Sequence, residues 1–382
     1  MDDGSRIRLW PASVGLLAVV VPCACLGSLD YLGDTSAGAG ASSTSGPGGS
    51  GGGGGSPCDD VVEDADNCGQ CGHSCLGGPC IDSRCQPVVV AADQDGPFGI
   101  GVDDTHVYWA NEGAREIRRA PKTGGDDEVL ATSTAGGTEF VPLFLVVVGG
   151  QVVWSNNEAG QLDGRALMTC PTAGGPAAGF AASAPDGNSG LAADGDRFWF
   201  ANFGQNDLRV ADFGQDATPF ISGEHGPAQV AVDETHVYWT NELEDSGGVR
   251  RAPREGGPAE TLDPDVPSAN GIALDADAVY VTSGTRVRRI PKQRGRGVDL
   301  DSSLFGPAGI VAIGGRVYWV NSGDGDGSTG TVKTVDAGGL EEPVELAAGQ
   351  SVPVLIAADD KQIFWTNRGS EPGTGSVMRV AR

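Results

Sequence analysis

The sequence is poor in basic residues, in aromatic residues and in long apolar runs. Lysine and arginine number 25 against 51 aspartates and glutamates, which gives a formal net charge of -26 at pH 7. A surface of that sign repels phosphate backbones, so nucleic acid is not an expected partner. Only 20% of the residues are charged, whereas 62 are glycine and 23 are proline. This composition disfavours long helices and indicates short strands joined by tight turns.

An apolar segment near the N-terminus indicates export. Ala12 to Val21 is too short to span a bilayer as a stable helix, and no other segment of the sequence is long enough. Arg6 and Arg8 precede this segment, so residues 1–25 are predicted to be an export signal.

Two cysteines follow at the place where bacterial lipoproteins are cleaved and acylated. Ala24 supplies the small residue needed before the modified cysteine, so the resemblance to lipoproteins implies lipidation of Cys25, with Cys23 as the second candidate. Ordinary signal cleavage followed by secretion is the alternative. We expect the protein in the cell envelope, touching a membrane only through a lipid anchor, or in the extracellular space.

Residues 26–57 are expected to form a flexible tether. Between Gly33 and Pro57, 11 of 25 residues are glycine, and serine, alanine and threonine supply most of the others. Such a chain cannot bury enough apolar surface to fold, and as a coil it reaches roughly 25–30 Å.

A cysteine-rich module is expected over residues 58–86. It contains Cys58, Cys68, Cys71, Cys75, Cys80 and Cys85. Six closely spaced cysteines behind an export signal predict three disulfides, whose pairing the sequence leaves open. Zinc held by cysteines and His73 is the alternative, but thiolates survive poorly outside a reducing compartment. The run from Asn67 to Cys75 resembles the small cysteine-rich modules of secreted myxobacterial proteins, which implies an extracellular module without a reaction.

The remaining chain, residues 87–382, repeats one unit. Seven strands each carry two successive bulky residues, at steps of 38 to 46 residues. We call the second bulky residue the blade anchor: Trp109, Trp154, Phe200, Trp239, Val281, Trp319 and Trp365. Repeats of this length with several short strands are typical of propeller blades. We predict one all-β propeller of seven four-stranded blades, with the anchors packed between blades.

The ends of the repeat region predict how the ring closes. The last unit has three strands and then the sequence ends, whereas Pro87 to Ala91 is an additional strand before the first unit. We expect this N-terminal strand to complete the last blade, which removes two open sheet edges.

The anchor motifs resemble those of a known family. Tyr108 to Asn111 and Tyr238 to Asn241, each followed by Arg-Arg-Ala-Pro and a Gly-Gly turn, resemble the YWTD propellers of lipoprotein-receptor ectodomains. Asn replaces the Asp of that motif, and seven units stand where that family usually has six. The resemblance covers most of residues 98–382; it implies protein recognition on the propeller faces and carries no catalytic residues across.

Polar residues that recur with the repeat have structural interpretations. An asparagine two residues past the anchor is expected to hold its own turn; the positions are Asn111, Asn156, Asn202, Asn241, Asn321 and Asn367. Arginine pairs at 118–119, 250–251 and 288–289 are either a basic rim or ordinary surface charge. Cys170 is expected to be a buried, unpaired thiol.

No set of a nucleophile and a base stands out, and no cofactor is expected. Some lactonases and gluconolactonases hold a divalent metal in the propeller channel with side chains placed just before inner strands. By that analogy Asn188, Asn270 and Glu139 are the candidate metal ligands of an alternative, hydrolytic function. The leading prediction is a non-catalytic propeller that binds a protein, a peptide or a glycan.

Overall fold

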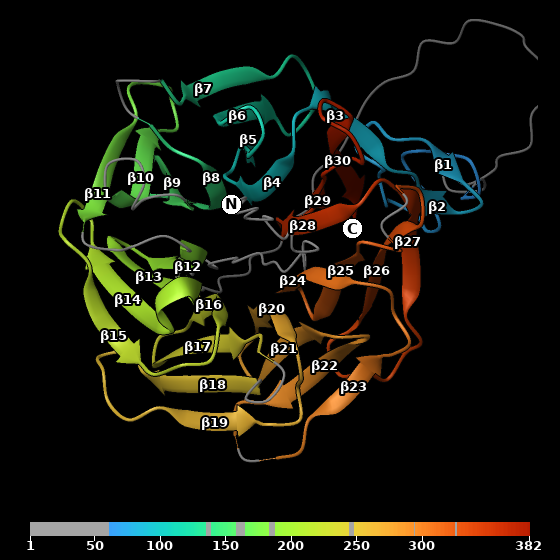
Figure 1. The fold of residues 1–382 in the computed structure, drawn as a ribbon. Coiled ribbons are helices and arrows are strands. Elements are labelled where there is room, and N and C mark those ends of the chain that lie inside the picture. Colours follow the sequence, from blue (N-terminus) through green and yellow to red (C-terminus); the bar gives the residue numbers. More distant parts are fainter. Residues whose placement is uncertain are drawn as a thin grey trace, which may run out of the picture.

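Seven four-stranded antiparallel sheets stand around a common centre and form a β-propeller (Figure 1). This computed structural model describes residues 61–134, 139–157, 165–182, 188–243, 248–293, 295–324 and 327–382. The predicted fold is confirmed: an all-β propeller of seven blades, preceded by a small disulfide-linked module. The predicted export signal, the tether and the residues Cys23, Cys25 and Cys58 lie outside the described residues.

Each blade is a four-stranded meander whose first strand lies nearest the centre of the ring (Figure 1). Blade 1 is β4 (Pro97–Val102), β5 (His106–Asn111), β6 (Glu116–Pro121) and β7 (Glu128–Thr132). Blade 2 is β8 (Pro142–Val148), β9 (Gln151–Asn156), β10 (Arg165–Pro171) and β11 (Ala178–Ala182). Blade 3 is β12 (Asn188–Asp194), β13 (Arg197–Asn202), β14 (Asp207–Asp212) and β15 (Thr218–Ser222), with the 3-10 helix η1 (Phe203–Gln205) after β13.

The other four blades repeat this plan. Blade 4 is β16 (Pro227–Val232), β17 (His236–Asn241), β18 (Gly248–Pro253) and β19 (Glu260–Asp263). Blade 5 is β20 (Ala269–Leu274), β21 (Ala278–Ser283), β22 (Arg286–Pro291) and β23 (Val298–Asp301). Blade 6 is β24 (Pro307–Ile313), β25 (Arg316–Asn321), β26 (Gly330–Asp336) and β27 (Val344–Gln350). Blade 7 is β28 (Pro353–Ala358), β29 (Gln362–Asn367), β30 (Gly375–Ala381) and β3 (Val88–Gln94).

The ring closes through the N-terminal strand, as predicted. β3 is the outer strand of blade 7 and pairs with β30, with Val89 opposite Met378 and Ala91 opposite Val377. The strands that begin and end the propeller therefore share one sheet, and their main-chain hydrogen bonds hold the ring shut.

Glycine lets the inner strands of neighbouring blades approach closely. A Cβ atom on Gly99 would lie 2.3 Å from the carbonyl oxygen of Leu143 in blade 2, and one on Gly309 would lie 2.8 Å from that of Val354 in blade 7. Both neighbours are main-chain atoms, so a larger residue would force the strands apart. Hydroxyl groups add hydrogen bonds between blades: Thr366 of blade 7 donates to the Phe98 carbonyl of blade 1 at 2.8 Å.

The seven blade anchors are all fully buried, each with 0% of its surface exposed. They pack against the neighbouring blade: Trp154 shares a core cluster with Tyr108 of blade 1, and Trp239 shares one with Trp199 of blade 3. The wide apolar contact area of these side chains fills the space between two twisted sheets.

The asparagine after the anchor acts differently from our expectation in several blades. In blade 4, Glu224 accepts hydrogen bonds from Trp239 Nε1 and Asn241 Nδ2, both at 2.8 Å. Gln94, at the end of β3, and Gln350, at the end of β27, accept the corresponding two bonds from blades 1 and 7, all at 2.9 Å. These acceptors come from the segment that enters the blade, so the asparagine joins successive blades. The expected local turn is found at Asn202, which accepts from the Gln205 amide at 3.2 Å.

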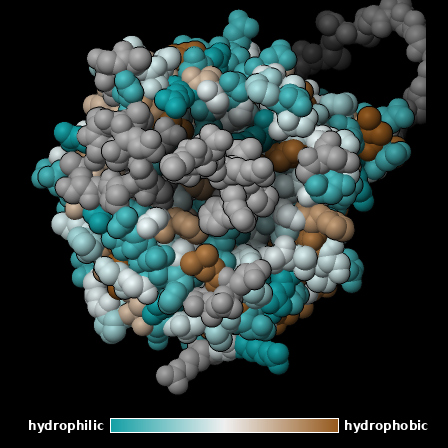
Figure 2. Space-filling view, viewed as in Figure 1, coloured by the Kyte–Doolittle hydropathy of each residue, from teal (hydrophilic) through white to brown (hydrophobic). Residues whose placement is uncertain are grey.

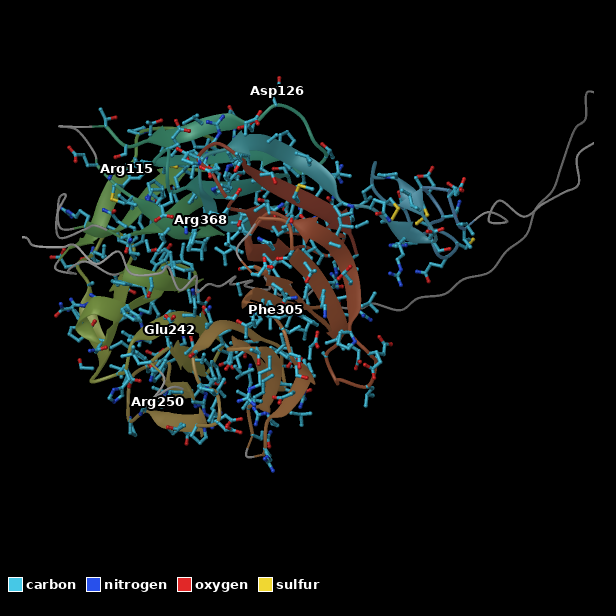
Figure 3. The ribbon with its side chains drawn as sticks, turned by 45° about the vertical axis from the view of Figure 1, so that its right-hand side comes forward. Arg115, Asp126, Glu242, Arg250, Phe305 and Arg368 are labelled. Carbon is cyan, nitrogen blue, oxygen red and sulfur yellow. A yellow bond between two sulfur atoms is a disulfide. The ribbon has the colours of Figure 1, made fainter. Side chains whose placement is uncertain are left out.

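The cysteine-rich module contains a two-stranded ribbon, β1 (Cys80–Ile81) and β2 (Arg84–Cys85), and lies beside the ring with its disulfides drawn in yellow in Figure 3. The bridges are Cys68–Cys80 and Cys75–Cys85, and Cys71 is also disulfide-bonded. Within the described residues, Cys68, Cys75 and Cys85 are the one group of three His, Cys, Asp or Glu ligands close enough to share a metal. Because these sulfurs are in disulfides, the cluster is not a zinc site.

Cys170 is a free, fully buried cysteine, as expected, and burial raises the pKa of its thiol to about 11. In the part of the chain that the structure describes, no helix has the length and hydropathy needed to cross a bilayer.

Candidate functional site

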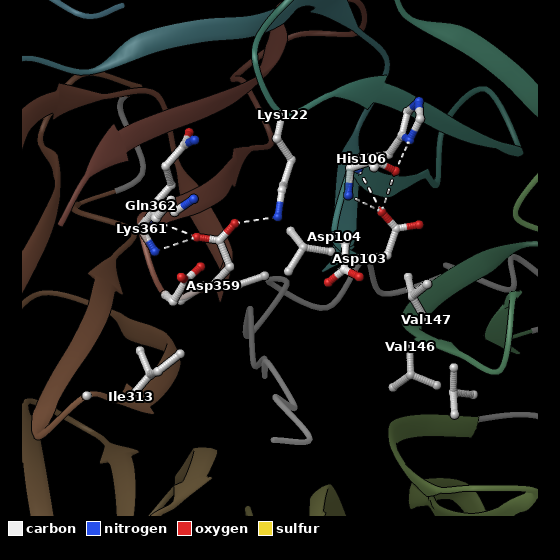
Figure 4. A pocket seen from close by; sticks show the side chains of 18 of the residues that line it. Asp103, Asp104, His106, Lys122, Val146, Val147, Ile313, Asp359, Lys361 and Gln362 are labelled. Carbon is white, nitrogen blue, oxygen red and sulfur yellow. Dashed lines mark hydrogen bonds and ion pairs between the residues drawn. The ribbon is translucent and has the colours of Figure 1, made fainter. Parts of the chain in front are cut away.

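A cavity of about 1480 Å³ opens at the end of the ring where the first and second strands of each blade meet. Its walls are aliphatic and come from the inner strands, with Val146 and Val147 of blade 2 facing Ile313 of blade 6 across the opening (Figure 4). None of the described residues that line it is phenylalanine, tyrosine or tryptophan. A preformed concave site with apolar walls and a few polar groups at its edge is the usual form of a binding pocket.

Aspartates in the turns shape the edge of this cavity. Asp103 accepts from the amides of Thr105 and His106, both at 2.7 Å, and from the Tyr108 hydroxyl at 2.6 Å. Burial raises the pKa of Asp103, but these hydrogen bonds outweigh burial and hold the pKa below its ordinary value. The same Asp-to-Tyr bond, five residues apart, recurs at Asp233 and Asp275. His106 and His236, which share one position of the repeat, each bond a threonine hydroxyl in this turn.

Charged side chains fasten the turns of one blade to the next. Lys122 of blade 1 pairs with Asp359 of blade 7 at 2.5 Å (Figure 4), and Lys292 of blade 5 pairs with Asp233 of blade 4 at 2.8 Å. For Asp359 as well, burial raises the pKa, and the hydrogen bonds from Lys122 and the turn amides lower it below its ordinary value. The cavity edge is therefore held in place before any ligand arrives.

The recurring arginine pairs do not form a free basic rim. Five of the six arginines each pair with a nearby carboxylate, namely Arg118, Arg119, Arg250, Arg251 and Arg288. The sixth, Arg289, contacts the Tyr280 side chain. Arg119 and Arg251 also reach the main-chain oxygens of Thr172 and Lys292 in the following blade. These side chains therefore neutralise acids and connect blades.

The charge around the cavity is negative. Five aspartates line it, namely Asp103, Asp104, Asp275, Asp359 and Asp360, against Lys122, Lys361 and Arg316. Lys122 is already paired with Asp359, and Arg316 with Glu341 outside the cavity. Within the described residues, Asp103, Asp104, Asp275 and Asp360 have no cationic partner, so the site attracts a positively charged group.

The opposite mouth of the ring has a different surface. Arg368 of blade 7 pairs with Glu112 of blade 1 at 2.8 Å across the closure, and Glu242 is a half-buried carboxylate whose pKa is raised by burial. Arg368, Glu242 and Phe305 lie toward the centre of the ring in Figure 3, and Phe305 is 72% exposed. In Figure 2 apolar residues show as separate patches, so this view offers no continuous apolar face.

The three candidate metal ligands belong to three different blades, and neither Asn270 nor Glu139 lines the cavity. Asn188 begins β12 of blade 3 opposite Asn202, and Asn270 lies near the start of β20 in blade 5, so β16 of blade 4 stands between them. Asn270 is buried, and its main-chain oxygen accepts from Thr240 at 2.8 Å.

Glu139 precedes β8 of blade 2 and is half-buried. It stands fifteen residues before the anchor Trp154, which is the separation of Gln94, Glu224 and Gln350 from the tryptophans they bond. Glu139 shares their repeat position but does not make their bond, because Trp154 Nε1 has no hydrogen-bond partner among the described residues.

Sequence reasoning missed a buried amide in the inner strand of blade 4. Gln229 is 1% exposed and lies against Gly190 of blade 3, and both polar atoms of its amide lack a partner among the described residues. Leu355 occupies the same register position in blade 7, since Gln229 pairs with Thr240 as Leu355 pairs with Thr366. The available signal was the repeat itself, because the other six units carry glycine, phenylalanine or leucine at this position.

Replacing Gln229 with leucine should raise the free energy of unfolding by about 1–3 kcal/mol, because an unpaired buried amide carries its full desolvation cost. Thermal denaturation of Gln229→Leu beside the wild type measures the change. A lower melting temperature would show that the amide is satisfied in solution.

Comparisons with known proteins support the propeller fold. No protein-family model matches the sequence. A structure of streptogramin B lyase superimposes with a TM-score of 0.62 at 14% identity, covering 78% of this chain and 97% of the lyase. Virginiamycin B lyase from Staphylococcus aureus gives 0.62 at 14% identity, with coverage of 78% and 98%. A chain of the nidogen/laminin complex gives 0.51 at 17% identity, with coverage of 64% and 93%. At these identities the likeness is one of fold.

Proposed function

We propose that this protein is an exported, non-catalytic binding propeller whose cavity receives a basic, aliphatic peptide segment of a partner protein. The observation that carries the proposal is the combination of aliphatic walls with an edge on which four aspartates have no cationic partner among the described residues. Lysine or arginine side chains complement that edge, and alternate aliphatic side chains fit the walls. The nidogen/laminin complex is a protein assembly that contains a similar propeller fold.

The proposal is tested with defined peptides. Fluorescence anisotropy is measured with labelled Lys-Val-Lys-Val-Lys-Val, with Glu-Val-Glu-Val-Glu-Val and with Lys-Ser-Lys-Ser-Lys-Ser. We expect the Lys-Val peptide to bind most tightly and its affinity to fall with added salt, because exposed charges are screened. Equal binding of the Glu-Val peptide, or binding of neutral maltohexaose in place of all three peptides, would overturn the proposal.

Charge reversal locates the site. The exposed residues Asp104 and Asp360 line the cavity, so the double variant Asp104→Lys/Asp360→Lys should bind the Lys-Val peptide about tenfold more weakly. The matched control is Asp126→Lys/Asp216→Lys, which changes two exposed aspartates away from the cavity by the same charge. Equal weakening in both double variants would show that net charge, and not this cavity, attracts the peptide.

The same preparation tests the hydrolytic alternative. A divalent metal that copurifies in stoichiometric amount, and whose removal by a chelator lowers the melting temperature, would direct attention to Asn188, Asn270 and Glu139. Retention of peptide binding in the presence of the chelator supports the binding function.

A further inference from the structure

The cysteine-rich module is attached to the last blade next to the cavity. Arg379 of β30 donates to the main-chain oxygen of Leu76 at 2.9 Å and to Gln362 Oε1 at 3.1 Å. Arg379 is 4% exposed, and burial lowers its pKa from the ordinary value. A buried guanidinium is costly unless its hydrogen bonds are made, so this contact fixes the position of the module.

A second connection runs through His73 to the last residue of the sequence. The two ring nitrogens of His73 lie 2.7 Å from the main-chain oxygen of Cys68 and 2.6 Å from that of Arg382. The Arg382 guanidinium in turn donates to the main-chain oxygens of Asp359 and Ile313, at 2.9 and 3.0 Å. Asp359 and Ile313 both line the cavity, so the module is connected to two of its turns through Arg382.

The module also supplies part of the wall. Leu76 lines the cavity together with the propeller residues and is half-buried. Its backbone has a φ of 53°, in the left-handed region that a branched, non-glycine residue rarely adopts. Backbone strain of this kind persists where surrounding contacts maintain it and where the side chain has a use. Here Arg379 holds the Leu76 carbonyl, and the residue packs against the hydrophobic core of the ring while it also lines the cavity.

We propose that the cysteine-rich module is part of the peptide-binding site, with Leu76 as an aliphatic specificity residue and with His73 and Arg382 as positioning residues for the cavity edge. This inference rests on the proposed function, because it assigns a further wall to the same cavity. It gives the disulfides a role in recognition: they hold Leu76 at the mouth of a site formed mainly by the propeller.

The test compares two apolar residues of the module. Leu76→Ala removes the aliphatic side chain that the module contributes to the cavity lining. The control Ile81→Ala truncates a residue that is 52% exposed and does not line the cavity. We expect Leu76→Ala to weaken binding of the Lys-Val peptide about three- to tenfold, as the loss of a partly buried aliphatic group predicts. Ile81→Ala should bind like the wild type.

A glycine variant separates recognition from structure. Leu76→Gly relieves the positive φ, so it should melt no lower than the wild type while it binds the Lys-Val peptide as weakly as Leu76→Ala. Unchanged affinity in both Leu76 variants, together with a weakened Asp104→Lys/Asp360→Lys variant, would overturn this inference and leave the proposed function standing. Failure of the wild type to bind the Lys-Val peptide would overturn the proposed function itself.

Discussion

Replacing Glu224 with alanine should lower the free energy of unfolding by about 3–5 kcal/mol, because it leaves two buried donors and the half-buried guanidinium of Arg250 without an acceptor. Glu224 is 3% exposed and accepts hydrogen bonds from Trp239 Nε1, Asn241 Nδ2 and Arg250 Nη1, at 2.8, 2.8 and 2.7 Å. Urea denaturation followed by tryptophan fluorescence measures the loss.

The other blades provide matched controls for this position. Glu224→Gln keeps an acceptor for Trp239 and Asn241, as Gln350 provides one for Trp365 and Asn367 of blade 7, but it leaves Arg250 without a carboxylate. Met378 stands opposite Trp365 where Arg250 stands opposite Trp239, so Glu224→Gln/Arg250→Met reproduces the arrangement of blade 7. We expect this double variant to lie within about 1 kcal/mol of the wild type. If Glu224→Ala proved equally mild, the buried network would not be a source of stability.

Replacing Gly99 with valine should lower the free energy of unfolding by about 3 kcal/mol, which is the upper end of the usual cost of an overpacked core. The first added carbon would lie 2.3 Å from the Leu143 carbonyl oxygen and 3.0 Å from the Leu145 amide nitrogen. These are main-chain atoms of the next inner strand, which is held in its own sheet. Valine has a high β propensity. The loss of stability would therefore report the close approach of the two blades and not a poorer strand former.

A graded series tests this explanation. Gly99→Ala should cost less than Gly99→Val, and the control Ala312→Val, on an inner strand where the side chain is half-buried, should change stability by less than about 1 kcal/mol. Equal losses for Gly99→Val and Ala312→Val would indicate that inner-strand volume, and not the inter-blade contact, limits stability.

The architecture followed from the sequence because a propeller is a local repeat. Each unit carries its own strands, turns and anchor, so the spacing of the anchors predicts the blades without knowledge of distant contacts. The fifth unit departs from the repeat, with Val281 in place of an aromatic anchor and Ser283 in place of the asparagine. It still forms a complete sheet because the pairing of β20 to β23 depends on main-chain bonds. The closing strand was predictable for the same reason. The last unit has only three strands, and Pro87 to Ala91 is an additional strand before the first unit.

The interactions between units were predicted less well. The asparagine after each anchor was expected to hold its own turn, yet Asn111, Asn241 and Asn367 bond a residue seventeen positions earlier. A fixed separation between an amide and a distant acceptor is visible in the sequence only after the structure shows which segments meet. The arginine pairs are a similar case, because their carboxylate partners include residues of the segment that enters the blade.

By itself the sequence determined an all-β propeller of seven blades, its closure by the N-terminal strand and a disulfide-bonded module before it. Period, turn residues and cysteine count are local properties, and each has a direct structural meaning. Only the tertiary structure decided the pairing of Cys68 with Cys80 and of Cys75 with Cys85, and the cavity that Leu76 shares with the propeller. The physical reason is that these features depend on the packing of residues far apart in the chain, which no local pattern records.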